Sequence, residues 1–201
     1  MSSRLILASK SPRRHELLKL MGLDFEVIPS RVMENIVPME SPKEHVIRLA
    51  EAKARDVADG YPDSWVIAAD TIVTINGSIL GKPKKREEAI EMLRRLSGQD
   101  HWVLTGFSVC HLGRGVNDKE AVQTTVRVKP LTTVEMDWYV QTGEPFDKAG
   151  GYAIQGIGSF MIESIRGSFT NVVGLPLCEL IQMLQRLGAI TISEFGLRIV
   201  E

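Results

Sequence analysis

Two adjacent arginines occupy a place where helix electrostatics disfavours positive charge. Residues 11–14, Ser-Pro-Arg-Arg, follow an apolar run and read as a first helical turn, because Ser11 is a good N-cap and Pro12 suits the first helical position. Each cation at that end of a helix is unfavourable by roughly 0.3–1 kcal/mol. A bound anion would reverse the sign, since free backbone N–H groups and guanidinium groups together receive phosphate. Arg13 and Arg14 therefore predict a phosphate site, with a solvated, exposed first turn as the alternative.

Asp70 interrupts an apolar run, residues 65–73, that is typical of a strand buried on both faces. An unpaired buried carboxylate costs several kcal/mol, so Asp70 needs a cation, a metal ion or several donors. Catalysis or metal binding is one interpretation, and a structural aspartate capped by backbone amides is the other. Glu34 lies in the loop 29–39 and could join Asp70 in holding a divalent cation, although a solvated loop glutamate is the default.

Lysines extend this set of possible phosphate ligands. Lys53 falls among the apolar positions of a predicted helix that begins after Ser41, where it either extends to solvent or contacts phosphate. Lys82 lies in the Gly-Lys-Pro segment 81–83, which by itself indicates only a surface lysine. The cations that together could neutralise a triphosphate are Arg13, Arg14, Lys53, Lys82 and Lys148.

Composition and motif spacing exclude several other classes. The formal net charge of −1, from 24 basic and 25 acidic residues, gives no global field for nucleic acid. The chain has no P-loop pattern, no zincin spacing of histidines and no metal-ligand spacing of cysteines. Cys110 and Cys178 lie in apolar segments, so we expect both to be buried and reduced. No apolar run approaches the roughly 20 residues of a membrane span, so a cytoplasmic, soluble protein is expected.

The elements that must position these residues follow an α/β order, and we expect one continuous domain over residues 1–201. Apolar periodicity, capping boxes and glycine stops define them. The predicted strands are 5–8, 25–28, 65–75, 102–112, 119–129 and about 160–165, with a hairpin at Asn76-Gly77. The predicted helices are 12–21, about 42–59, 87–96, one from Thr132 to Gly143 and one from Pro176 to Gly188. The glycine-rich loop 143–159 is long enough to be functional.

Several motifs, in family order, closely resemble the Maf family of nucleoside triphosphate pyrophosphatases, over residues 5 to about 187. They are the segments 7–14 (LASKSPRR), 69–71 (ADT), 81–83 (GKP), 147–150 (DKAG), 154–156 (IQG) and 173–176 (VGLP). The resemblance implies a curved mixed β-sheet flanked by helices with a deep central cleft, similar to inosine triphosphate pyrophosphatases. It also implies a hydrolase acting on acid anhydrides, which cleaves a nucleotide to monophosphate and pyrophosphate with Mg²⁺ or Mn²⁺, and a homodimer.

Residue roles come with the same resemblance. Asp70 matches the proton acceptor, and Arg13, Thr71 and Gln155 match positions linked to substrate choice. The positions expected at the site are Ser9, Arg13, Arg14, Glu34, Lys53, Asp70, Thr71, Lys82, Asp147, Lys148 and Gln155. Asp70, Lys82 and Glu34 are the catalytic candidates, and Glu34 and Asp70 the metal ligands. Gln155 and the Ser-Pro-Arg-Arg segment resemble the subgroup that hydrolyses dTTP and UTP.

Two alternatives stay open at the level of sequence. One is a nucleotide-binding regulator of cell division with little turnover, although such a binder has no need of a buried carboxylate. The other is cleansing of noncanonical purine nucleotides such as ITP, which Gln155 disfavours. Met33 stands where relatives often carry an acidic residue, which removes one candidate metal ligand.

Overall fold

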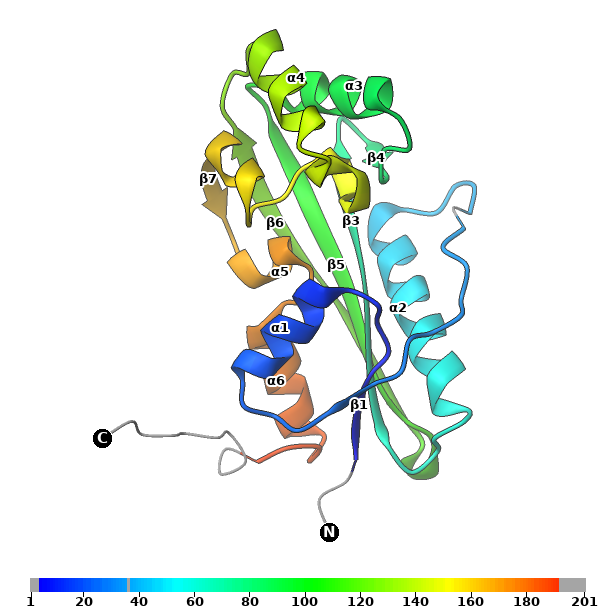
Figure 1. The fold of residues 1–201 in the computed structure, drawn as a ribbon. Coiled ribbons are helices and arrows are strands. Elements are labelled where there is room, and N and C mark those ends of the chain that lie inside the picture. Colours follow the sequence, from blue (N-terminus) through cyan, green and yellow to red (C-terminus); the bar gives the residue numbers. More distant parts are fainter. Residues whose placement is uncertain (1–3, 36, 192–201) are drawn as a thin grey trace, which may run out of the picture. The chain divides into compact units, whose positions relative to one another are not determined.

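The computed structural model describes residues 4–35 and 37–191 as an alternation of strands and helices (Figure 1). The strands are β1 (Leu5–Leu7), β2 (Glu26–Val27), β3 (Trp65–Ile75), β4 (Ser78–Leu80), β5 (Asp100–His111), β6 (Val116–Val128) and β7 (Ile162–Arg166). The α-helices are α1 (Pro12–Leu20), α2 (Pro42–Ala58), α3 (Arg86–Leu96), α4 (Thr133–Gln141), α5 (Phe169–Val173) and α6 (Leu177–Arg186). Short 3₁₀ helices are η1 (Leu112–Arg114), η2 (Glu144–Asp147), η3 (Ala149–Gly151) and η4 (Ile157–Met161).

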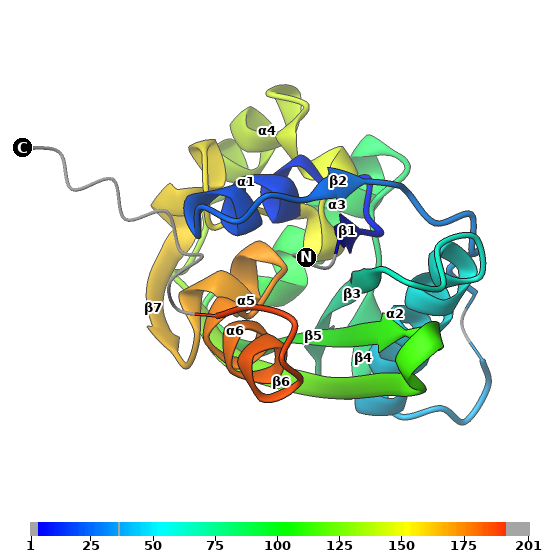
Figure 2. The ribbon, with the colours of Figure 1, turned by 90° about the horizontal axis from the view of Figure 1, so that it is seen from below.

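The strands form one mixed sheet in the order β2-β1-β3-β5-β6-β7, with β4 paired to β3. β1 is parallel to both β2 and β3, whereas β3 with β4 and β6 with β7 are antiparallel. The neighbours β5 and β6 are joined through η1 (Figure 2). The predicted mixed α/β sheet flanked by helices is therefore confirmed, while the deep central cleft stays a prediction.

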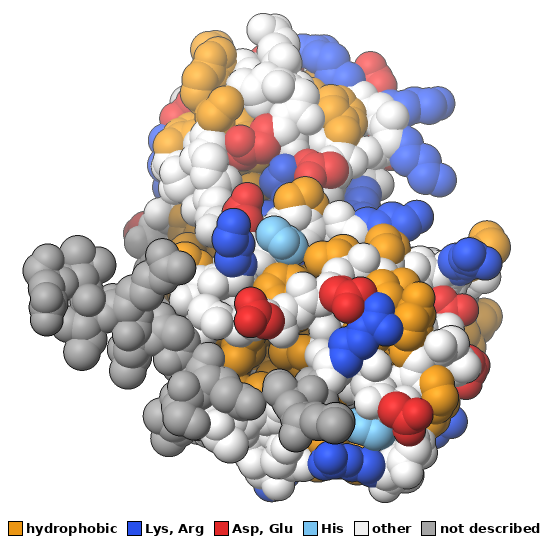
Figure 3. Space-filling view, turned by 60° about the horizontal axis from the view of Figure 1, so that its bottom comes forward, with side chains coloured by type: hydrophobic (Ala, Val, Ile, Leu, Met, Phe, Trp, Pro, Cys, Tyr) orange, Lys and Arg blue, Asp and Glu red, His pale blue; other side chains and the backbone are white. Residues whose placement is uncertain are grey.

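The chain divides into two compact units, each described here by itself. The first comprises the described residues up to Asp70, Thr105–Ala121 and those from Gly174 on, and the second comprises Thr71–Leu104 and Val122–Val173. The single domain over residues 1–201 stays a prediction. Among the described residues no helix is both long and apolar enough to cross a membrane. Acidic and basic side chains are interspersed on the face shown in Figure 3.

Local sequence signals account for the helix starts. Ser11 caps α1 by accepting from the N–H of Arg14, and Pro12 is the first helical residue. Ser41 with Glu44 and Thr132 with Glu135 form the two predicted capping boxes, which start α2 and α4. Each such cap satisfies backbone donors that no intrahelical carbonyl can reach.

Helix α2 approaches the sheet closely within the first unit. A Cβ atom on Gly106 of β5 would lie 2.3 Å from the carbonyl oxygen of Val46, so only glycine allows this contact. The same unit has an apolar core that includes Ile6, Ala54 and Val66. Because its buried face packs on the sheet, α2 holds Lys53 in a fixed position next to β3.

The second unit has its own core, to which α3 and α4 contribute Leu93, Leu96 and Tyr139. These helices lie side by side (Figure 1). On β6, Thr124, Val126 and Val128 are buried, whereas Thr125 and Arg127 between them are only partly buried, so one face of the strand packs on the core.

The structure differs from the sequence-based predictions in three places, and each difference has a local cause. The loop 143–159 contains η2, η3 and the start of η4, because short turns around glycines satisfy its backbone. Helix α5 was not predicted, since its five residues carry too short a pattern for a 3.6-residue period. Cys110 is buried and Cys178 is exposed, both free, so the expectation of two buried cysteines was wrong for Cys178. Residue 178 lies on the solvent side of the first turn of α6.

Candidate active site

The N-terminus of α1 places Arg14 inside the first unit rather than in solvent. Its Nε donates to the carbonyl of Gly174 at 2.7 Å, and one terminal nitrogen donates to Oγ of Ser9 at 3.3 Å. Ser9 also accepts from the N–H of Ser11 at 3.2 Å, which fixes the loop between β1 and α1. Arg14 is therefore held by both the preceding loop and the segment before α6, and the solvated alternative is excluded for this residue.

The buried carboxylate of Asp70 has a cationic partner. Nζ of Lys53 lies 2.7 Å from Oδ1 of Asp70, and both side chains are more than nine-tenths buried. The same ammonium nitrogen lies 2.5 Å from Oε1 of Glu34. One lysine thus joins two carboxylates, and the alternative in which Lys53 extends to solvent is wrong.

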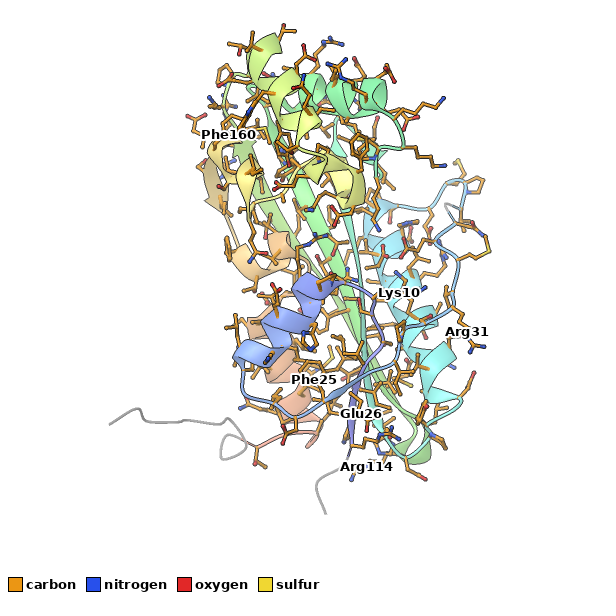
Figure 4. The ribbon with its side chains drawn as sticks, viewed as in Figure 1. Lys10, Phe25, Glu26, Arg31, Arg114 and Phe160 are labelled. Atoms are coloured by element: carbon orange, nitrogen blue, oxygen red, sulfur yellow. The ribbon has the colours of Figure 1, made fainter. Side chains whose placement is uncertain are left out.

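Glu34 reaches this pair although its side chain is half exposed, because its loop is attached to α2 on both sides. Before Glu34, the N–H of Arg31 donates to Asp56 at 2.8 Å, and Figure 4 shows Arg31 in the segment alongside α2. After Glu34, Arg48 donates to the carbonyl of Asn35 at 3.1 Å. Helix α2 therefore supplies both the lysine and the anchors of the loop that brings Glu34 to it.

A buried carboxylate fixes Arg48 in turn. Glu40 accepts from Nε of Arg48 at 2.6 Å and bonds to Nδ1 of His45 at 3.0 Å. The bond from Arg48 is the main cause that lowers the pKa of Glu40 to about 2, with His45 adding to it against burial. The pKa of Arg48 is raised by the same contact. This ion pair is structural support for the Glu34 loop.

The charges of the first unit interact around Arg14. Burial lowers the pKa of its guanidinium group, whereas the carboxylates of Asp70 and Glu34 oppose that change and Arg13 adds to it. Two arginines, one lysine and two carboxylates thus share one electrostatic environment. Their formal charges sum to +1, which suits an anionic ligand accompanied by a cation.

In the second unit, two predicted segments lie together. The N–H of Gly150 donates to the carbonyl of Gly81 at 2.9 Å, which joins η3 to the Gly-Lys-Pro segment. Lys82 is exposed, while Lys148 is largely buried, with its ammonium group paired to Asp147 and 3.3 Å from the carbonyl of Glu144. The backbone of the Gly-Lys-Pro segment therefore lies against η3, which directly follows Asp147 and Lys148 in the chain.

Gln155 is exposed in the turn between η3 and η4, and Thr71 follows Asp70 along β3. Sequence reasoning missed two residues that hold the predicted ones, Arg48 and Glu144, and it gave Gly174 only as part of the VGLP motif. The position of Glu144, between Gly143 and Pro145 at the start of a glycine-rich loop, was the available signal.

Among the described residues, no group of three or more His, Cys, Asp or Glu side chains could hold a metal ion.

The fold is that of an α/β sheet protein. Its Lys53–carboxylate contacts and the arginines at the N-terminus of α1 form an arrangement of charges that suits a phosphorylated ligand. The family model described as "Maf-like protein" matches residues 4–187, and the chain therefore belongs to the Maf-like family.

Curated relatives cover almost the full chain. A protein of Syntrophus aciditrophicus named "dTTP/UTP pyrophosphatase" is 50% identical over 193 residues, which is 96% of this chain and 94% of that protein. One of the same name from Syntrophotalea carbinolica is 50% identical over 190 residues, 94% of this chain and 86% of that protein. Among solved structures, the Ham1 protein of Staphylococcus aureus is 16% identical with a TM-score of 0.48, covering 92% of this chain and 97% of that one.

Proposed function

We propose that this protein hydrolyses dTTP and UTP, and modified pyrimidine nucleotides of the same kind, to the monophosphate and pyrophosphate. The observation that carries the proposal is the buried Asp70 carboxylate held 2.7 Å from Lys53, which a mere nucleotide binder would not need. Relatives that are 50% identical over nearly the whole chain and named dTTP/UTP pyrophosphatase support the same activity.

The bond to be broken joins the α-phosphorus to the oxygen that bridges to the β-phosphate. Asp70 accepts the proton of the attacking water, and pyrophosphate leaves with the bridging oxygen. Arg13, Arg14 and Lys53 neutralise phosphate oxygens, and Ser9 supports Arg14. Lys82, Asp147 and Lys148 are further substrate-binding residues in this proposal, on the basis of the family resemblance.

Glu34 and Asp70 fit a divalent cation, Mg²⁺ or Mn²⁺. Both carboxylates reach one ammonium nitrogen, at 2.5 Å and 2.7 Å, so they are close enough to share a single cation. Mg²⁺ binds with one or two protein carboxylates, several waters and substrate phosphate oxygens. When bound, it would polarise the α-phosphate and lower the pKa of a coordinated water.

We assign recognition of the nucleobase to Gln155, with contributions from Arg13 and Thr71. Its side-chain carbonyl can accept from N3–H of thymine or uracil while its amide donates to a ring carbonyl. Cytosine has no N3–H, so it would match only with a flipped amide and fewer contacts. We expect partial discrimination rather than complete rejection, because unmatched polar groups carry the penalty.

The test is pyrophosphate release from a panel of dTTP, UTP, dCTP, GTP and ITP, with Mg²⁺ or Mn²⁺ and after chelation. Preferential turnover of dTTP and UTP supports the proposal. Binding of dTTP without turnover would favour the alternative, a nucleotide-binding regulator of cell division. Preference for ITP would favour cleansing of noncanonical purines.

The remaining expectations are a cytoplasmic location and a homodimer with no nucleic-acid or membrane partner. Two free cysteines support a reducing compartment. Sedimentation of the purified chain tests the dimer.

A further inference from the structure

Glu144 holds the backbone of the loop that carries Gln155. Its Oε1 accepts from the N–H of Gly158 at 2.9 Å and from the hydroxyl of Tyr139 at 2.9 Å. Its Oε2 accepts from the N–H of Ile157 at 3.0 Å. Both carboxylate oxygens are therefore used, and two of the three donors are consecutive backbone amides at the start of η4.

The backbone between Gln155 and these amides leaves little freedom. Gly156 has a φ of 82°, a conformation that side chains rarely adopt. A Cβ atom there would also lie 2.7 Å from Oε2 of Glu144. The carboxylate thus packs directly against the turn, one residue after Gln155.

We propose that Glu144 is a positioning residue for base selection, which acts by fixing the direction in which Gln155 presents its amide. This inference rests on the proposed function, in which Gln155 distinguishes thymine and uracil from cytosine. An exposed side chain on a loose turn would lose discrimination, because geometry decides whether both hydrogen bonds to the base form together.

The chemistry of the carboxylate makes the proposal testable by an isosteric change. In Glu144→Gln, one oxygen becomes an NH₂ group, which cannot accept from a backbone N–H. Whichever way the new amide is turned, one of the two backbone bonds is lost, while volume and packing are kept. Tyr139→Phe is the matched control: it removes the third donor to Glu144, together with the bond of that hydroxyl to the backbone of Ala153, and leaves both backbone bonds to Glu144 intact.

The experiment measures kcat and KM for dTTP and dCTP in five proteins: wild type, Glu144→Gln, Tyr139→Phe, Gln155→Ala and the double variant Glu144→Gln/Gln155→Ala. We expect Glu144→Gln to reduce the preference for dTTP about tenfold, mainly through KM for dTTP. Tyr139→Phe should keep the preference within about twofold. Adding Glu144→Gln to Gln155→Ala should change the preference no further, since the effect passes through Gln155.

A readout independent of catalysis accompanies these kinetics. Hydrogen exchange at the amides of Ile157 and Gly158 should accelerate in Glu144→Gln and stay near wild type in Tyr139→Phe. Equal losses for dTTP and dCTP in Glu144→Gln would mean a purely structural role and would overturn the inference. A wild-type enzyme with no preference for dTTP would instead overturn the proposed function, and this inference with it.

Discussion

The ammonium nitrogen of Lys53 lies 2.7 Å from the carboxylate of Asp70, in a part of β3 that is otherwise apolar. The two charges compensate each other where water is largely excluded. This pair makes a buried carboxylate tolerable, because the ammonium group supplies the opposite charge and a hydrogen bond.

Asp70→Asn should therefore abolish turnover while preserving binding. Asparagine keeps the shape but accepts no proton, so kcat for dTTP should fall by about a thousandfold. Lys53 retains Glu34 as a partner, and the fold should persist. The measurements are pyrophosphate release and calorimetric binding of dTTP, with the exposed Asp24→Asn as control. An Asp70→Asn protein with a tenth of wild-type turnover would show that another group is the base.

Lys53→Met should destabilise the fold through the charge left behind. Removing one partner of a buried ion pair costs about 3–5 kcal/mol, because the remaining charge is uncompensated. Arg14 reduces that cost in part, since its charge interacts with Asp70. The double variant Lys53→Met/Asp70→Asn should recover more than half of the lost free energy of unfolding.

Urea unfolding of the wild type, both single variants and the double variant measures this coupling. Equal instability of Lys53→Met and the double variant would mean that lost packing by Lys53, rather than the unpaired charge, is responsible.

Sequence patterns predicted the elements of the fold well because each left a local signature. Caps at Ser11, Ser41 and Thr132 fixed helix starts within one residue. The apolar run that Asp70 interrupts, followed by the Asn76-Gly77 turn, gave β3 with its ends correct. The division into two compact units had no local signal, since β3, β5 and β6 each contribute residues to both units.

The site was predictable where a residue type contradicted its surroundings, as for Asp70 and Lys53. Their pairing was not, because residues 53 and 70 meet only once α2 packs on the sheet. In sequence Arg48 looked like an ordinary surface charge, and Glu144 was marked only by its place between Gly143 and Pro145. Their importance depends on backbone groups, the carbonyl of Asn35 and the amides of Ile157 and Gly158, which no residue type reveals.

Arg14→Lys should weaken substrate binding although it conserves charge. The guanidinium donates to Gly174 and Ser9 in different directions, whereas a lysine offers a point charge without that fork. KM for dTTP should rise about tenfold with a smaller change in kcat. Arg14→Gln, which removes the charge, is the comparison. If Arg14→Lys behaves as wild type and only Arg14→Gln is impaired, charge rather than geometry is what Arg14 supplies.

The stability of the protein should fall in mild acid because of His101. This side chain on β5 is 2% exposed, and burial lowers its pKa to about 4, against a small opposing effect of Asp100. Its Nε2 lies 2.6 Å from the hydroxyl of Tyr152. Between pH 6.5 and 4 the unfolded chain binds a proton at this position and the folded chain does not. The free energy of unfolding therefore decreases as the pH falls through that range, by up to about 3 kcal/mol.

His101→Gln removes this titration and keeps a group that can bond to Tyr152, so its unfolding free energy should depend less on pH between 6.5 and 4. Tyr152→Phe is the matched control, because burial rather than the tyrosine lowers the pKa of His101. Tyr152→Phe should retain the wild-type pH slope even if its stability is lower throughout. Urea unfolding at half-unit steps of pH measures all three proteins. Parallel curves for wild type and His101→Gln would mean that other groups cause the acid sensitivity.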